Sequence, residues 1–197
     1  DDLGEKVAAE YGVRFIRHAL TRENHKNVLD PLVGRGDFLL NLSVDVSSLA
    51  LVQLCWDKGA LYLDTCIEPW AGGYTDPTVS PSRRTNYALR ESALALRETK
   101  TRAPTAVLTH GANPGLISHF TKQALLDIAR QALTDKKFSG AQAEKIAHHA
   151  RAQEFNHLAH QLGVKVIHCS ERDTQITDQP KQVNEFVNTW SVEGFRE

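Results

Sequence analysis

The stretch that decides the fold is residues 37–70, DFLLNLSVDVSSLALVQLCWDKGALYLDTCIEPW. Its first part, FLLNLSV (38–44), is a nearly continuous apolar run, which is typical of a strand buried on both faces. Residues 45–59 carry apolar side chains at helical spacing and end in glycine, so they predict a helix. ALYLDTC (60–66) predicts the next strand. A strand, a helix and a strand in this order indicate a parallel pair joined by a right-handed crossover.

The same alternation continues on both sides of this stretch. Further strands are expected at 13–18, 104–110, 164–170 and 185–195. Further helices are expected at 2–11, 80–99, 116–133 and 141–162, and residues 21–33 predict a short helix and a loop. Such alternation predicts an α/β fold built on a parallel sheet.

The composition is that of an ordinary globular protein. The chain has 197 residues, 41% hydrophobic and 24% charged, which suffices for one large domain or for one domain and part of a second. The net charge of −1 gives no reason to expect nucleic acid or a membrane as a partner. Without a membrane-spanning apolar run or a signal peptide, and with three scattered cysteines, the sequence predicts a cytoplasmic protein with reduced thiols.

Polar residues follow the ends of three predicted strands. Asp45, Glu68 and Asn113 each come just after an apolar run. The carboxyl ends of parallel strands share one edge of the sheet, and ligands bind at that edge. The sequence therefore predicts a binding site there. A simpler interpretation stays open for Asp45 and Asn113, because each could cap the helix that follows it.

Five motifs carry a family resemblance in addition to residues 37–70. They are LDTCIEPWAGGYTDPT (63–78), RTNYALRE (84–91), THGANPGLISHF (109–120), ERDTQ (171–175) and EFVNTWSVEGF (185–195). As a set they resemble motifs of the saccharopine-dehydrogenase-like proteins, and among these of the bacterial homospermidine synthases. The resemblance covers essentially the whole chain.

This resemblance implies a two-domain enzyme that uses tightly held NAD and works as a homodimer. Putrescine or a related diamine is oxidised to an imine by hydride transfer to NAD⁺. A second putrescine displaces ammonia from the imine, and the same NADH reduces the product to sym-homospermidine.

The family pattern also indicates what this chain lacks. The dinucleotide fingerprint GxGxxG, which opens the first strand in the family, does not occur here. We therefore expect an internal fragment: a partial Rossmann-type parallel sheet in residues 1–114, without its first strands, followed by the start of a second α+β domain in 115–197. In the family's strand order, the strand at 13–18 would then have no partner. The fragment alone is expected to be inactive.

A diamine at neutral pH is a dication, so its site needs carboxylates for the ammonium ends and aromatic faces along the chain. By resemblance, the substrate-binding residues are Trp190, Glu68, Asp45, Asn113 and Glu171. The cofactor-binding residues are Asp45, Asp64, Thr65 and Asn113. Glu171, Asn113 and His110 are the candidates for catalysis, with a proton relay as the role of His110.

Several of these residues also have a plainer interpretation. Trp190 could be a half-buried strand aromatic, and Glu171 a turn acid paired with Arg172. His110 is as well explained by a packed, neutral imidazole. The pair His148-His149 suggests a solvated helix face rather than a metal site, because other ligands are not evident, and no metal is predicted.

Two other functions stay open. The first is an NAD(P)H-dependent reductive-condensation dehydrogenase of the saccharopine or carboxynorspermidine type. Such an enzyme needs arginines to bind a substrate carboxylate. The candidate substrate-binding residues are instead mainly acidic and aromatic, and Arg172 is the one nearby residue that would suit a carboxylate. The second is a truncated chain without catalytic activity.

Overall fold

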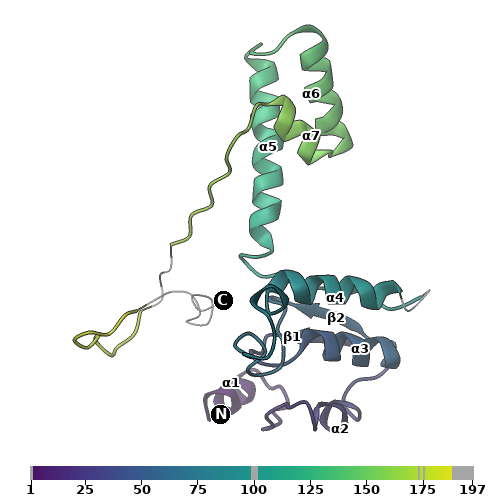
Figure 1. The fold of residues 1–197 in the computed structure, drawn as a ribbon, viewed down its shortest axis with the longest axis vertical. Helices are drawn as coiled ribbons and strands as arrows, with labels where there is room; N and C mark the ends of the chain where they lie inside the picture. Colours follow the sequence, from purple (N-terminus) through teal and green to yellow (C-terminus); the bar gives the residue numbers. More distant parts are fainter. Residues whose placement is uncertain (1, 99–101, 173, 175, 188–197) are drawn as a thin grey trace. The chain divides into compact units, whose positions relative to one another are not determined.

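The computed structural model describes residues 2–98, 102–172, 174 and 176–187 (Figure 1). They divide into two compact units, residues 2–109 (unit 1) and residues 110–187 (unit 2). The domain limits 1–114 and 115–197 stay a prediction. No helix in the described part of the chain is both long and apolar enough to cross a membrane.

Unit 1 contains a parallel three-stranded sheet, which confirms the predicted α/β class. The strands lie in the order β1-β2-β3 and span Phe38–Asn41, Leu61–Asp64 and Ala106–Val107. Asn41 at the end of β1 pairs with Asp64 at the end of β2, and Tyr62 of β2 pairs with Ala106. The carboxyl ends of β1 and β2 are therefore level at one edge of the sheet.

The crossover helix α3 (Ser48–Lys58) begins and ends where local signals place it. The hydroxyl of Ser47 accepts a hydrogen bond from the Ala50 amide at 3.3 Å, which caps the first turn. Gly59 ends the helix in the left-handed conformation, at φ 78°, which suits a residue without Cβ. The helix predicted at 45–59 is confirmed, although its first residues form the preceding loop.

The core of unit 1 lies between α3 and the sheet. Its buried members are Val46, Leu51, Val52, Cys55, Ala60 and Tyr62. Leu39 packs against this core, whereas its neighbours Phe38 and Leu40 are 57% and 49% exposed. Because successive side chains of a strand point to opposite faces, one face of β1 is buried and the other is exposed. The prediction that this strand is buried on both faces was wrong.

The remaining elements of unit 1 are helical. They are α1 (Asp2–Glu10), α2 (His25–Leu29), the 3₁₀ turn η1 (Pro81–Arg83) and α4 (Asn86–Glu98). The helices predicted at 2–11 and 80–99 are confirmed, the second with a shorter helical span than expected, and so is the short helix predicted within 21–33. α4 lies against α3.

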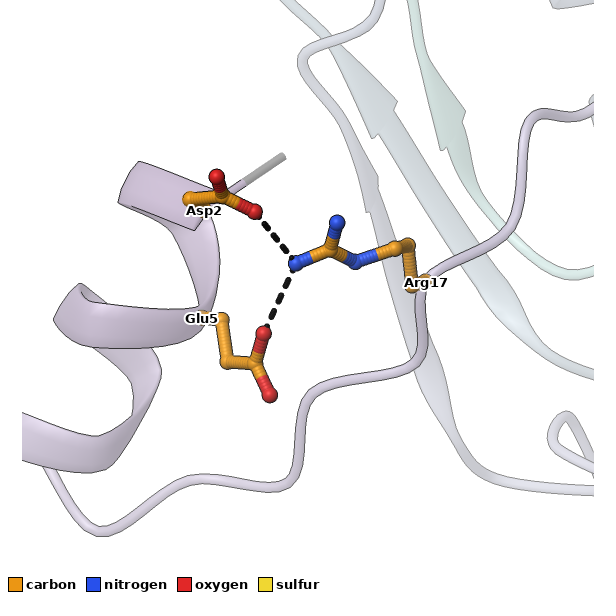
Figure 2. Close-up of polar contacts among 3 residues, drawn as sticks. All are labelled: Asp2, Glu5 and Arg17. Atoms are coloured by element: carbon orange, nitrogen blue, oxygen red, sulfur yellow. Dashed lines mark hydrogen bonds and ion pairs between the residues drawn. The ribbon is translucent and has the colours of Figure 1, made fainter.

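The segment 13–18, predicted as a strand, has no regular structure and is exposed. A strand needs hydrogen-bonding partners for its backbone, and the described sheet does not include this segment. Arg17 instead binds two acids of α1, Asp2 at 2.7 Å and Glu5 at 2.8 Å (Figure 2). All three side chains are more than half exposed, so each ion pair contributes at most about 1 kcal/mol.

Unit 2 is a helical hairpin with a third helix packed on it (Figure 1). Its helices are α5 (Leu116–Thr134), α6 (Gly140–Ala152) and α7 (Phe155–Gln161). The helix predicted at 116–133 is confirmed. The strand predicted at 164–170 is wrong, because those residues are irregular and mostly exposed. Of the strand predicted at 185–195, residues 185–187 are irregular and the rest lie outside the described residues.

The single helix predicted at 141–162 is broken in two. α6 ends at Ala152, and Gln153 adopts a left-handed conformation with φ 56°. A straight helix would hold Ile146 and Leu158 roughly 18 Å apart. In the broken arrangement both are fully buried in one cluster with Leu125 and Ala129 of α5. The break lets both side chains join the same buried cluster.

Candidate functional site

A chain of buried polar groups lies at the carboxyl ends of β1 and β2. The amide nitrogen of Asn41 donates to the Tyr62 hydroxyl at 3.1 Å, and that hydroxyl donates to Oδ2 of Asp64 at 2.9 Å. The three residues are 6%, 1% and 0% exposed. The two strand ends are therefore joined by side chains as well as by the backbone ladder.

The second oxygen of Asp64 reaches the third strand. Its Oδ1 accepts a hydrogen bond from the backbone amide of Thr109, just after β3. Thr109 has φ 60°, and Asp45, in the loop after β1, has φ 62°. Left-handed backbone is costly for residues other than glycine, and it gathers at sites where the surrounding structure holds it. The loops at this edge are thus held in defined conformations.

The ionisation of this buried group follows from its surroundings. Burial raises the pKa of Asp64, and hydrogen bonds from the Thr109 amide and from the Ser48 and Tyr62 hydroxyls act in the opposite direction. Burial also raises the pKa of Tyr62, and the nearby Asp64 charge adds to that rise. Tyr62 therefore stays a neutral phenol that donates a hydrogen bond to the carboxylate.

Glu68 is anchored to the first turn of α3 through its backbone. The Ser48 amide donates to the Glu68 carbonyl at 2.9 Å, and the Glu68 amide donates to the Ser48 hydroxyl at 3.0 Å. Glu68 and Thr65 are half-buried, whereas Asp45 is exposed. Glu68 is thus fixed next to a helix N-terminus, where the backbone dipole favours negative charge.

The rest of the loop after β2 is held by its own contacts. The Tyr74 hydroxyl lies 2.9 Å from the Ile67 carbonyl and 2.8 Å from the Asn86 side chain. The Trp70 ring lies 5.1 Å from that of His25. The aromatic residues of this loop therefore hold its conformation.

The predicted site residues are divided between the two units. Asp45, Asp64, Thr65 and Glu68 belong to unit 1, and His110, Asn113 and Glu171 belong to unit 2. Trp190 lies outside the described residues. The roles assigned to all eight stay predictions.

The cap interpretations of two of these residues are wrong. Ser47, not Asp45, caps α3, and Gly115, not Asn113, is the residue that precedes α5. Asn113 is exposed, in a turn closed by a bridge between Gly111 and Gly115. Neither Asp45 nor Asn113 is therefore explained by helix capping.

The two remaining residues of unit 2 differ in their surroundings. His110 is half-buried, and its ring meets the edge of the His119 ring at 5.2 Å. Glu171 is exposed on an irregular segment. The imidazole of His110 therefore has a packing partner within unit 2.

Sequence reasoning missed three members of the buried polar chain: Asn41, Ser48 and Tyr62. The available signal was a polar residue at the last position of each of two apolar runs, Asn41 and Asp64. Their pairing depends on the register of the sheet, which the residues alone do not give.

A parallel sheet with a crossover helix and polar groups at its carboxyl edge is the arrangement found in Rossmann-type nucleotide-binding domains. Residues 1–108 match the model of the saccharopine dehydrogenase NADP binding domain, and the chain belongs to this family. The resemblance stated from the motifs is thereby confirmed.

Three relatives are similar over nearly the whole chain. The chain is 48% identical to the homospermidine synthase of Blastochloris viridis and 44% identical to that of Mesorhizobium japonicum, over 98% of its residues. It spans 39% of the length of each. A crystal structure of homospermidine synthase from Legionella pneumophila in complex with NAD is 43% identical in sequence, with a TM-score of 0.70. The match covers 96% of this chain and 36% of the Legionella pneumophila chain.

Replacing Tyr62 with Phe tests the buried polar chain. The change keeps the ring but leaves the Asn41 amide and one Asp64 oxygen without the hydroxyl between them. We expect the free energy of unfolding to fall by about 1–3 kcal/mol, measured by urea denaturation. The control Tyr87→Phe, at a residue that is 80% exposed, should change it by less than about 0.5 kcal/mol. Equal effects would contradict the proposed importance of the hydroxyl.

The raised pKa of Asp64 predicts a pH-dependent difference between the wild type and Asp64→Asn. A carboxyl whose pKa is higher in the folded than in the unfolded state contributes to stability at a pH below its unfolded-state pKa. This contribution is lost as the pH rises through the folded-state pKa. The free energy of unfolding of the wild type relative to Asp64→Asn should therefore decrease as the pH rises above the unfolded-state pKa of about 3.9. Urea titrations at several pH values measure it, and a constant difference would refute the raised pKa.

Proposed function

We propose that this chain is part of an NAD-dependent homospermidine synthase, with residues 1–114 in its cofactor-binding domain and residues 115–197 at the start of its second domain. The observation that carries the proposal is 48% identity to such an enzyme over 98% of the chain. A second supporting fact is the similarity to a solved homospermidine synthase that contains NAD. The chain spans 39% of the relatives' length, so the activity belongs to the whole protein.

The carboxyl edge of the sheet suits part of a dinucleotide. Asp45 and Thr65 follow adjacent parallel strands at the edge where such cofactors bind. Asp64 has both oxygens bonded within the protein, so it supports the cofactor site by holding the edge together. The glycine fingerprint that cradles the pyrophosphate is not in this sequence, so these residues serve other parts of the cofactor.

The substrate is a diamine such as putrescine. Glu68, fixed to the start of α3, binds one ammonium end, and Asp45 adds negative charge to the same edge. Trp190 and Glu171 supply a cation-binding face and a second carboxylate, and Asn113 binds the substrate amine. The acidic character of this set favours a diamine over a carboxylated substrate.

The reaction balances without net oxidation. Bound NAD would accept a hydride from the carbon that carries the amine and return it after the amine exchange. One putrescine loses its amino group as ammonia and its aminobutyl group becomes bonded to the second putrescine. Glu171 accepts the proton that the amine must lose before oxidation, and His110 relays it. The whole protein acts as a homodimer.

The decisive experiment uses the complete protein, obtained by extending the reading frame in both directions. It is incubated with putrescine and NAD⁺, and mass spectrometry follows the products. Homospermidine and ammonia in equal amounts, without accumulation of NADH, are expected. Coupling of an amine to a carboxylated aldehyde with consumption of NAD(P)H would instead assign the protein to the reductive-condensation dehydrogenases. Absence of both reactions would refute the proposal.

Substituting Glu68 with Gln in the complete protein tests its substrate role. The amide keeps the shape of the side chain but loses the charge that binds ammonium, so KM for putrescine should rise about tenfold or more. NAD binding, measured by protein fluorescence quenching, should stay unchanged. The control Asp76→Asn removes a charge from the same loop, where Asp76 accepts hydrogen bonds from Thr78, and should leave KM unchanged. Unaltered kinetics in Glu68→Gln would remove this residue from the site.

A further inference from the structure

The break between α6 and α7 gathers three imidazoles around one carboxylate. Nδ1 of His149 lies 2.6 Å from Oε2 of Glu154, and Nε2 of His148 lies 3.9 Å from the same oxygen. The ring of His157, on α7, stacks on that of His149 at 5.2 Å. All four residues belong to unit 2, and none of them has a part in the function proposed above.

The backbone places Glu154 beside the histidines. The Glu154 amide donates to the His149 carbonyl at 3.0 Å, and the left-handed Gln153 donates to Ala150 at 3.3 Å. The Leu158 amide in turn donates to the Glu154 carbonyl at 2.8 Å. Since Leu158 is fully buried, the turn is fixed from both sides. The arrangement is thus a product of the fold and does not depend on attraction between the side chains alone.

The distances fit a shared metal ion after small side-chain rotations. One ligand atom from each of His148, His149 and Glu154 lies within 4.8 Å of the others. Bonds of about 2.0 Å in a tetrahedral site put ligand atoms roughly 3.3 Å apart. The side chains of His148 and Glu154 are 66% and 44% exposed, so both have room to adjust, whereas that of His149 is 18% exposed and already held.

The site is open to an entering ion. His148 and His149 line a surface hollow together with Glu144, Lys145 and Gln161. Glu144 adds a second carboxylate to this hollow, while the ammonium group of Lys145 opposes it. The Glu154 side chain is 44% exposed, so an ion can approach the three residues from solvent. With Glu154 included, the two carboxylates outnumber the one lysine, which favours a cation.

We propose that His148, His149 and Glu154 form a binding site for a divalent transition-metal ion of the zinc type, with water completing the coordination. Two imidazoles and one carboxylate are a donor set that suits Zn²⁺, Co²⁺ or Ni²⁺. Mg²⁺ and Ca²⁺ prefer oxygen ligands and are disfavoured by the two nitrogens. An ion bound here would link the end of α6 to the start of α7.

The test is titration of the chelator-treated chain of 197 residues with Co²⁺, followed by competition with Zn²⁺. Binding at this site predicts visible absorption bands of Co²⁺ that saturate at one equivalent and disappear on addition of Zn²⁺. Glu154→Gln retains the size of the side chain and removes the anionic ligand, and it should weaken Co²⁺ binding about tenfold or more. Glu154→Gln should keep the helical circular dichroism of the wild type.

Two further variants make the outcome decisive. His148→Gln removes a ligand whose side chain is 66% exposed, so the fold should tolerate it, and it should weaken binding to a similar extent. His160→Gln removes an exposed histidine of α7 outside the cluster and should leave the affinity unchanged. Absence of saturable binding in the wild type, or equal affinity in the wild type, Glu154→Gln and His148→Gln, would overturn the proposal.

Discussion

The carboxylate of Asp64 is the group on which the arrangement of unit 1 depends. It is fully buried at the end of the central strand, where a charge without partners would be strongly unfavourable. Its two oxygens therefore accept hydrogen bonds from the Tyr62 hydroxyl and the Thr109 amide. Because Tyr62 is also bonded to Asn41, a single buried group connects the carboxyl ends of β1 and β2 with the chain just after β3. This connection holds the loops at the carboxyl edge of the sheet in place.

Local signals in the sequence were sufficient to predict the crossover helix α3. They failed for segments whose structure depends on backbone partners far away in the sequence. α3 forms between a serine cap and a left-handed glycine, both of which act within a few residues. The segments 13–18 and 164–170 have the composition of strands but are irregular in the described chain. Apolar character alone does not supply backbone partners, so composition could not decide these two segments.

For the candidate site, the sequence indicated which residues to consider but not the contacts that hold them. Asp45, Glu68 and Asn113 were singled out because each follows an apolar run, and their roles stay predictions. The anchoring of Glu68 to Ser48 spans 20 residues and had no local signal. The pair His148-His149 could not be judged from the sequence either. Glu154 lies five residues beyond His149, a spacing that does not place two side chains on one helix face. The left-handed Gln153 brings them together, and no pattern of apolar residues indicated that turn.

The hydrogen bond between Thr109 and Asp64 also has a consequence for local motion. Thr109 follows β3 and lies in no helix or strand, yet its amide proton is held by a buried carboxylate. Amide protons of irregular segments usually exchange quickly with solvent, while those in cooperative units exchange only when the unit opens. The Thr109 amide should persist in heavy water as long as the amides of β2. Its signal in a nuclear magnetic resonance spectrum would then report the first opening of the sheet's carboxyl edge.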